Sequence, residues 1–301
     1  MVRLRSAQKM ALAQMASGFV LVFRRMLGLS ARTLAKRGGL LWDLDLSEGI
    51  DLSIYLLGAF EPSTVKLYRG LVKAGDTVLD IGGNIGAHTL PLARLVGARG
   101  RVIAFEPTAY AIGKMRANIA LNRELSDRIS VHQVMLVSDE SGPLAPQVYS
   151  RWPLFETGGE VHREHGGQLM ETKGAVAMTL DHALQSMGAN AVDFIKMDVD
   201  GHEHEVLVGG KRTIHARKPR ILMELAPYLY EQESRVLEEM LDLLKACGYS
   251  MSEAGTSRVL PFDALRLREM IPFGRTCNVL LQPTAISRDS PPAHTALSVT
   301  C

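Results

Sequence analysis

The order of apolar and polar positions predicts alternating strands and helices over most of the chain. Apolar runs rich in β-branched residues predict buried strands, and apolar residues at helical spacing predict helices. Repeated βα units of this kind predict a doubly wound α/β fold with a mostly parallel sheet and helices on both faces. The predicted order is strand 77–82, helix 85–96, strand 101–106, helix 109–122, strand 129–137, then strand 192–199, helix 203–214, strand 220–225, helix 230–246, and strands 248–253 and 276–282.

Three segments fall outside this alternation, so the α/β domain is assigned to residues 61–283. Residues 1–60 are predicted to form a basic helical segment and a lead-in, and the Ser-, Thr- and Pro-rich residues 284–301 a disordered tail. Residues 139–176 interrupt the domain with prolines, glycines and aromatic residues. Long irregular insertions are usually functional, so this one is expected to cover the ligand cleft on the acceptor side. A surface hairpin is the alternative.

The sequence Asp80-Ile-Gly-Gly-Asn-Ile-Gly86 follows the first predicted strand of the domain, and Glu106 follows the second. Glycines in a strand-to-helix turn let the backbone approach a ligand, and an acid at the end of the next strand can accept hydrogen bonds from ribose hydroxyls. Asn84 stands where a dinucleotide site needs glycine against a pyrophosphate. S-adenosylmethionine, which has no phosphate, therefore fits better than NAD, and an NAD-linked dehydrogenase remains the alternative. The predicted cofactor-binding residues from this motif are Asp80, Gly82, Asn84, Gly86 and Glu106.

These motifs and several later ones resemble the FkbM family of S-adenosylmethionine-dependent methyltransferases over residues 64–283. The later ones are Ala104-Phe-Glu-Pro107, Val137-Ser-Asp139, Thr179-Leu-Asp-His-Ala-Leu184, Asp193-Phe-Ile-Lys-Met-Asp-Val-Asp-Gly-His-Glu203 and Arg220-Ile-Leu-Met-Glu224.

The resemblance implies a class I, Rossmann-like methyltransferase whose last strand is antiparallel. It implies O-methylation of a hydroxyl on a small-molecule acceptor such as a sugar, glycan or polyketide-like metabolite. It also adds Ser138 and Asp139 to the cofactor-binding residues. Two positions depart from the family pattern: Asp200 stands where glutamate is commoner, and Leu136 where a smaller residue is usual, which could alter the adenine pocket.

Ligands of open α/β sheets bind at the carboxyl ends of the strands, where Asp198 and Glu224 are predicted to lie. Methyl transfer to a hydroxyl needs alignment and the removal of a proton, so Asp198, Glu224 and His202 are the candidate catalytic residues. Asp198, Asp200 and Glu224 could instead hold Mg²⁺. Asp200 could also cap the next helix. His202 and His204 are two apart on a predicted helix and point in different directions, which disfavours zinc.

Charge is concentrated at the start of the chain. Residues 1–42 hold eight lysines and arginines and no acid, although the net charge of the whole chain is only +2. The apolar run Met10–Phe23 is 14 residues long, about 21 Å as a helix, and is too short for a bilayer core of ~30 Å. Peripheral contact of residues 10–37 with an anionic membrane is one expectation. A helix that packs on the domain or on a partner subunit is the other, and a non-catalytic membrane-associated binding protein is a further alternative for the whole chain.

The rest of the composition limits compartment and partners. The remaining residues are net acidic, which disfavours a nucleic-acid substrate. Three cysteines without C-x-x-C spacing disfavour disulfides and a structural zinc site. A cytoplasmic protein is therefore expected, and the sequence does not indicate its oligomeric state.

Overall fold

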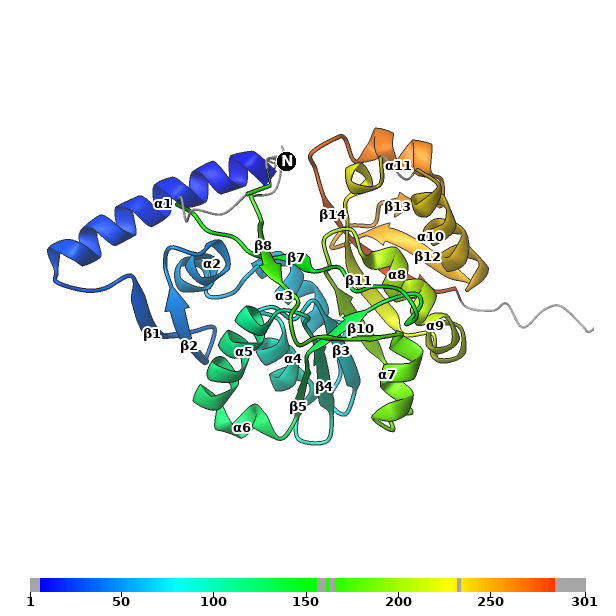
Figure 1. The fold of residues 1–301 in the computed structure, drawn as a ribbon, viewed down its shortest axis with the longest axis horizontal. Helices are drawn as coiled ribbons and strands as arrows, with labels where there is room; N and C mark the ends of the chain where they lie inside the picture. The colour runs from blue at the N-terminus through cyan, green and yellow to red at the C-terminus, as the bar shows by residue number, and fades with distance from the viewer. Residues whose placement is uncertain (1–5, 156–160, 163–165, 232–233, 285–301) are drawn as a thin grey trace, which may run out of the picture.

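The computed structural model describes residues 6–155, 161–162, 166–231 and 234–284, and its centre is an eight-stranded sheet (Figure 1). The strand order is β13-β12-β14-β11-β10-β3-β4-β5. The five strands from β11 to β5 run parallel, whereas β14 is antiparallel to β11 and β12, and β13 is antiparallel to β12. The predicted doubly wound α/β fold with a late antiparallel strand is confirmed. The bounds are β3 Thr77–Ile81, β4 Arg101–Phe105, β5 Ile129–His132, β10 Phe194–Met197, β11 Arg220–Leu225, β12 Tyr249–Glu253, β13 Val259–Leu260 and β14 Cys277–Pro283.

Each face of the sheet has its own apolar core, because alternate side chains of a strand point to opposite faces. One core joins Leu79, Ile195 and Ile221 to α7, α8, α10 and α11, and the other joins Val78, Phe194 and Leu222 to α2, α3 and α4. The helices are α2 Gly49–Leu57, α3 Pro62–Arg69, α4 Thr89–Val96, α5 Ala109–Leu121, α6 Arg123–Ser126, α7 Leu180–Ser186, α8 Glu203–Gly209, α9 Lys211–Arg217, the 3₁₀ helix η1 Pro227–Tyr230, α10 Ser234–Ala246 and α11 Ala264–Met270.

The strand order reverses between β3 and β10. The chain continues from β3 to β4 and β5 on one side, then returns to place β10 on the other side of β3. A ligand crevice in an open α/β sheet lies at such a reversal, outside the carboxyl ends of the strands. A ligand is therefore expected to bind next to the residues that follow Ile81 in β3 and Met197 in β10.

Three predicted elements differ from the structure for local reasons. The helix predicted from residue 85 begins at Thr89, because Asn84 and Gly86 have positive φ angles of 46° and 85°. The helix predicted over 203–214 breaks at Gly210, where a Cβ would lie 2.7 Å from Cδ2 of Leu180. The strand predicted over 129–137 is two: β5 pairs with β4, whereas β6 (Val134–Leu136) pairs with β9 (Val176–Met178) outside the central sheet.

The predicted lead-in contains a β-hairpin that the sequence analysis did not foresee. Helix α1 (Ser6–Met26) is followed by β1 (Arg32–Arg37) and β2 (Leu40–Asp45), which form an antiparallel pair (Figure 1). Gly38 and Gly39, with φ angles of 57° and 81°, make the two-residue turn; paired glycines are typical of such turns. Within the described parts of the chain, no helix is both long enough and apolar enough to span a membrane. The predicted disordered tail lies, from residue 285, outside the described residues.

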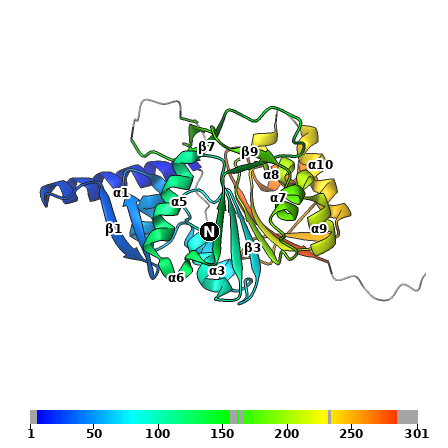
Figure 2. The ribbon, with the colours of Figure 1, turned by 60° about the horizontal axis from the view of Figure 1, so that its bottom comes forward.

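The insertion contains an antiparallel hairpin of β7 (Gln147–Arg151) and β8 (Gln168–Glu171). In Figure 2 the green strands β7 and β9 lie above one end of the central strands, between the blue N-terminal elements and the yellow helices. An ion pair of 2.7 Å between Arg151 and the buried Glu48 fastens the hairpin to the N-terminal part of the chain. The insertion is therefore in contact with both the lead-in and the carboxyl end of the sheet.

Candidate active site

The loop between β3 and α4 is shaped by residues that adopt positive φ. Gly82 has φ 78°, and a Cβ on it would lie 1.9 Å from the carbonyl oxygen of Asp198, so only glycine fits. Asn84 adopts the left-handed conformation, accepts the N–H of Ile85 with Oδ1 at 2.8 Å and donates from Nδ2 to the carbonyl of Ser150 at 2.9 Å. These contacts hold the loop against the end of β10 on one side and the insertion on the other.

Glu106 follows β4 and is buried next to this loop. Its Oε1 accepts three hydrogen bonds, from the N–H and hydroxyl of Thr108 at 3.0 and 2.6 Å and from the hydroxyl of Ser150 at 3.1 Å. Its Oε2 accepts one, from the N–H of Asn84 at 3.1 Å. Burial raises the pKa of Glu106, and these donors oppose the rise. A carboxylate oxygen can accept more than one hydrogen bond, so Oε2 retains capacity for a ligand hydroxyl.

Asp80 is not among the residues that line the cavity described below. Its side chain is fully buried and accepts the hydroxyl hydrogen of Thr89 at 2.5 Å. Its other oxygen, Oδ1, has no hydrogen-bond partner among the described residues. Burial raises the pKa of Asp80, and the nearby Lys196 opposes the rise. Asp80 therefore supports the loop from behind, and Gly86, which packs on Met115, is also absent from the lining.

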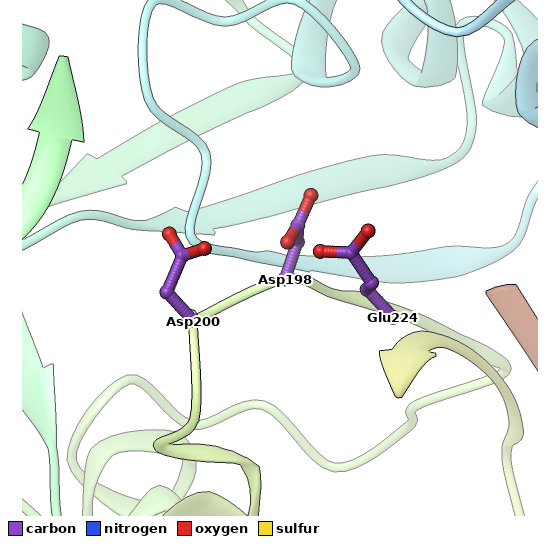
Figure 3. A group of neighbouring side chains, drawn as sticks. All are labelled: Asp198, Asp200 and Glu224. Carbon is purple, nitrogen blue, oxygen red and sulfur yellow. The ribbon is translucent and has the colours of Figure 1, made fainter. Parts of the chain in front are cut away.

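Three carboxylates converge at the ends of β10 and β11. Asp198, Asp200 and Glu224 each offer an oxygen, and these oxygens lie within 4.8 Å of one another. Figure 3 shows the carboxylates side by side, with Asp198 in the middle. Burial raises the pKa of Asp200 and of Glu224 well above the ordinary range, and the charge of Asp198 adds to both shifts. The raised pKa values favour the neutral forms of Asp200 and Glu224, and a bound cation would instead favour the ionised carboxylates.

Lys196 is the cation within this cluster. It is buried in β10, opposite Asp80 in the register of β3, and its Nζ lies 2.9 Å from Oδ2 of Asp198. Burial opposes its charge, but Asp198 and Asp80 outweigh burial and raise its pKa. The sequence analysis missed this residue, although a lysine in an otherwise apolar strand is a recognisable signal because isolated charges are rarely buried.

His202 lines the same cavity, directly before α8. The N-cap position of α8 belongs to His202, whose side chain makes no capping hydrogen bond, so the suggestion that Asp200 caps this helix is wrong. His204 is instead 3.7 Å from Glu239 on α10. Among the described residues, the only group of three or more possible metal ligands is the carboxylate trio.

The structure does not bring Ser138 and Asp139 to the cavity. Both are exposed, and Asp139 accepts hydrogen bonds from the N–H and hydroxyl of Ser141 at 3.0 and 2.6 Å. Leu136, just before them, does line the cavity. Ser150, which the sequence analysis did not single out, is the insertion residue that bonds to both Asn84 and Glu106.

One cavity of about 600 Å³ is lined by the loop between β3 and α4, by the acidic trio and by parts of the N-terminal segment. Its polar wall is formed by Asn84, Glu106, Lys196, the trio and His202, whereas α1, α2 and the insertion contribute mainly apolar and aromatic side chains. Tyr149 and Trp152 come from the insertion. The volume suits a small-molecule site, and its two chemically different ends suit a ligand with a polar head and an apolar part.

The Methyltransferase FkbM domain matches residues 80–251, more than half of the chain. The chain belongs to this family. The match runs from Asp80 in β3 to Met251 in β12, so it includes the loop between β3 and α4, Glu106 and the acidic trio. Membership of a methyltransferase family favours a methyl donor over NAD.

Curated relatives are distant and diverse. Ribosomal protein L11 methyltransferase of Bacillus cytotoxicus is 29% identical over 150 residues, 46% of this chain and 46% of that protein. Hexuronic acid methyltransferase AglP of Haloferax volcanii is 26% identical over 152 residues, 50% and 56% of the two chains, so this chain spans about half the length of each of these two relatives. The 2-O-methyltransferase NoeI of Sinorhizobium fredii is 25% identical over 225 residues, 66% and 88% of the two chains.

Proposed function

We propose that this chain transfers a methyl group from S-adenosylmethionine to a hydroxyl of a small-molecule acceptor. One observation carries the proposal. The loop between β3 and α4, which lies within the match to the methyltransferase family, lines the same cavity as Lys196 and the acidic trio. A donor held at the loop and an acceptor held at the cluster would then meet within the same enclosed volume. The cofactor supplies an electrophilic methyl group, so the S–CH₃ bond breaks as the O–CH₃ bond forms and the sulfur keeps its electron pair.

The donor side is assigned to Gly82, Asn84 and Glu106. Glu106 would accept the ribose hydroxyls with Oε2, the oxygen that accepts a single hydrogen bond within the chain. Gly82 and Asn84 line the cavity, and both have positive φ angles, 78° and 46°. Asp80 and Thr89 would act indirectly, by holding the base of the loop.

The acceptor side is assigned to Asp198, His202 and Glu224. An alcohol gives up its proton reluctantly, so a group in the cavity must take it as the new bond forms. His202 is the proposed proton acceptor because it lines the cavity and a neutral imidazole offers one ring nitrogen as an acceptor. Asp198 would orient the hydroxyl, and Lys196 would stabilise its developing negative charge, since the raised pKa of Lys196 keeps this side chain protonated.

A divalent cation is the second form of the same mechanism. Carboxylate oxygens are the preferred ligands of Mg²⁺, and three of them within 4.8 Å could close around one ion after small side-chain movements. Asp198, Asp200 and Glu224 would hold the ion, which would polarise the acceptor hydroxyl and lower its pKa. The two forms assign the same three acids to the acceptor side.

The acceptor class is proposed on chemistry and relatives together. Aromatic side chains of the insertion suit the faces of a sugar or polyketide-like ring, and two of the three relatives are by name a hexuronic acid methyltransferase and a 2-O-methyltransferase. The net acidic charge beyond residue 42 disfavours a nucleic-acid acceptor.

The test has two steps. Calorimetric titration of the whole chain with S-adenosylmethionine and, separately, NAD should show binding of the first alone. Incubation with methyl-labelled S-adenosylmethionine and a panel of hydroxylated sugars and polyketides should then label an acceptor in an alkali-stable ether linkage. Binding of NAD instead would overturn the donor assignment, and label that appears only on amines or protein would overturn the acceptor assignment.

A further inference from the structure

Helix α1 has two apolar faces, and the described residues of the protein cover only one of them. Met10, Ala13 and Val20 pack on the core beneath, and Ser17 is buried there with its hydroxyl donating to the carbonyl of Leu46 at 2.7 Å. The other face is exposed, with Phe19 at 83% of its maximal accessibility. Its members recur at spacings of three and four residues, which makes a continuous stripe along the helix: Leu12, Met15, Phe19, Val22, Phe23 and Met26.

Exposed basic side chains continue from the C-terminal end of this stripe. Arg25 is exposed at the end of α1, and β1 presents Arg32, Leu34 and Lys36 on its exposed side. Leu34 is 68% exposed, so apolar and basic residues alternate there as well. No acid occurs before Asp43. On the paired strand β2, Asp43 stands opposite Leu34, and Asp45 stands opposite Arg32, which lies 3.7 Å from it. Helix α1 and β1 together therefore present an apolar surface edged by the exposed basic side chains of Arg25 and Lys36, which is termed here the N-terminal surface.

The N-terminal surface is continuous with the mouth of the cavity. Leu12 belongs to the exposed stripe and also lines the cavity. Leu56 and Leu57, at the end of α2, are likewise exposed and line the cavity. A molecule seated on the stripe would therefore touch the entrance through which an acceptor reaches the carboxylates.

We infer that the N-terminal surface docks the chain on an anionic bilayer with the cavity mouth facing the lipid. Apolar side chains that enter the interface, flanked by Arg and Lys near anionic headgroups, are the features that hold a helix on a membrane surface. A second copy of this chain would bring like charges together, which disfavours a dimer through this face. If the proposed function holds, the acceptor is a hydroxylated headgroup carried by a lipid, because the apolar mouth accepts its chain while the polar wall receives the headgroup.

The test uses the whole chain without cofactor or acceptor, so its result does not depend on the proposed function. Flotation with phosphatidylcholine vesicles should show little binding. Vesicles in which about a quarter of the phosphatidylcholine is replaced by phosphatidylglycerol should bind the chain at low salt and release it at high salt. Phe19→Gln with Val22→Gln should lower the partition coefficient at least about tenfold. Val259→Gln with Leu265→Gln, at equally exposed positions on β13 and α11, is the matched control and should change nothing.

The direction of the mouth is tested with brominated lipids, which quench nearby tryptophan. Leu57→Trp should add a fluorescence component that these lipids quench, whereas Leu265→Trp should add one that they do not quench. Equal partition of the two double variants would overturn the docking surface. If the chain binds no vesicles and has the mass of a dimer in solution, and if Phe19→Gln with Val22→Gln restores the mass of a monomer, the stripe is the contact between two copies instead. Quenching of Leu265→Trp alone would overturn the orientation.

Discussion

Replacing Glu106 by glutamine should weaken S-adenosylmethionine binding while leaving the fold in place. Oε1 of Glu106 accepts three hydrogen bonds within the chain, so the new amide nitrogen should take the position of Oε2, which accepts only the N–H of Asn84. There it cannot accept from Asn84 or from a ribose hydroxyl. A hydrogen bond to a charged acceptor contributes about 1.5–3 kcal/mol, which corresponds to an increase in Kd of about 10- to 150-fold.

Isothermal titration calorimetry measures this change, and a thermal melt of each variant shows that it is folded. Glu124→Gln, at an exposed position on α6, removes the same charge far from the loop and should leave Kd unchanged. An unchanged Kd in a folded Glu106→Gln variant would refute the reasoning, since the ribose would then be held elsewhere.

Four further outcomes are expected. Asp198→Asn should lower kcat about 100-fold or more with little change in cofactor Kd, and normal turnover by this variant would remove Asp198 from the chemistry. A chelator should abolish activity, with recovery on addition of Mg²⁺, if the carboxylates hold a metal, whereas full activity in the chelator would select His202 as the base. Burial lowers the pKa of His88 well below 6.5, so its contribution to stability is present above that pH and is lost as pH falls; urea unfolding should show a decline below pH ~6.5 that His88→Gln reduces and the exposed-site variant His215→Gln does not. Gly82→Ala should lower the melting temperature or prevent folding, because its Cβ would lie 1.9 Å from the carbonyl oxygen of Asp198, and a wild-type melt would contradict this geometry.

The central sheet was predictable because most of its strands are short, mainly apolar runs that can be recognised in the sequence without the structure. Thr77–Ile81 and Phe194–Met197 are buried from end to end, although each contains one charged residue, Asp80 and Lys196. The hairpin at 32–45 was missed because Arg32, Lys36 and Arg37 make its first strand resemble a basic tail, although Gly38-Gly39 carried the turn signal. The start of α4 shifted because Asn84 and Gly86 adopt positive φ angles, and the helix predicted over 203–214 is broken at Gly210.

The sequence predicted which residues lie at the ends of the strands, but not which of their side chains line the cavity or what they contact. Sequence order places Asp80 at the tip of β3, but it does not show that the side chain accepts the hydroxyl hydrogen of Thr89 and stays out of the cavity lining. The bond from Ser150 to Glu106 joins residues 44 apart, through an insertion whose path no periodicity describes. Such contacts depend on the assembled tertiary structure, so sequence patterns alone could not supply them.

The close approach of Gly82 to the backbone of Asp198 bears on two tasks of the enzyme, holding the methyl donor and choosing the acceptor. The loop proposed to hold the methyl donor rests on the main chain of the residue proposed to meet the acceptor, so their spacing is set by backbone against backbone. In-line transfer depends on that spacing. Leu12, Leu56 and Leu57, on α1 and α2, line the cavity as well but are exposed, so their exchange is expected to leave that spacing in place. Variation of these three side chains is therefore a favourable starting point for selecting new acceptors.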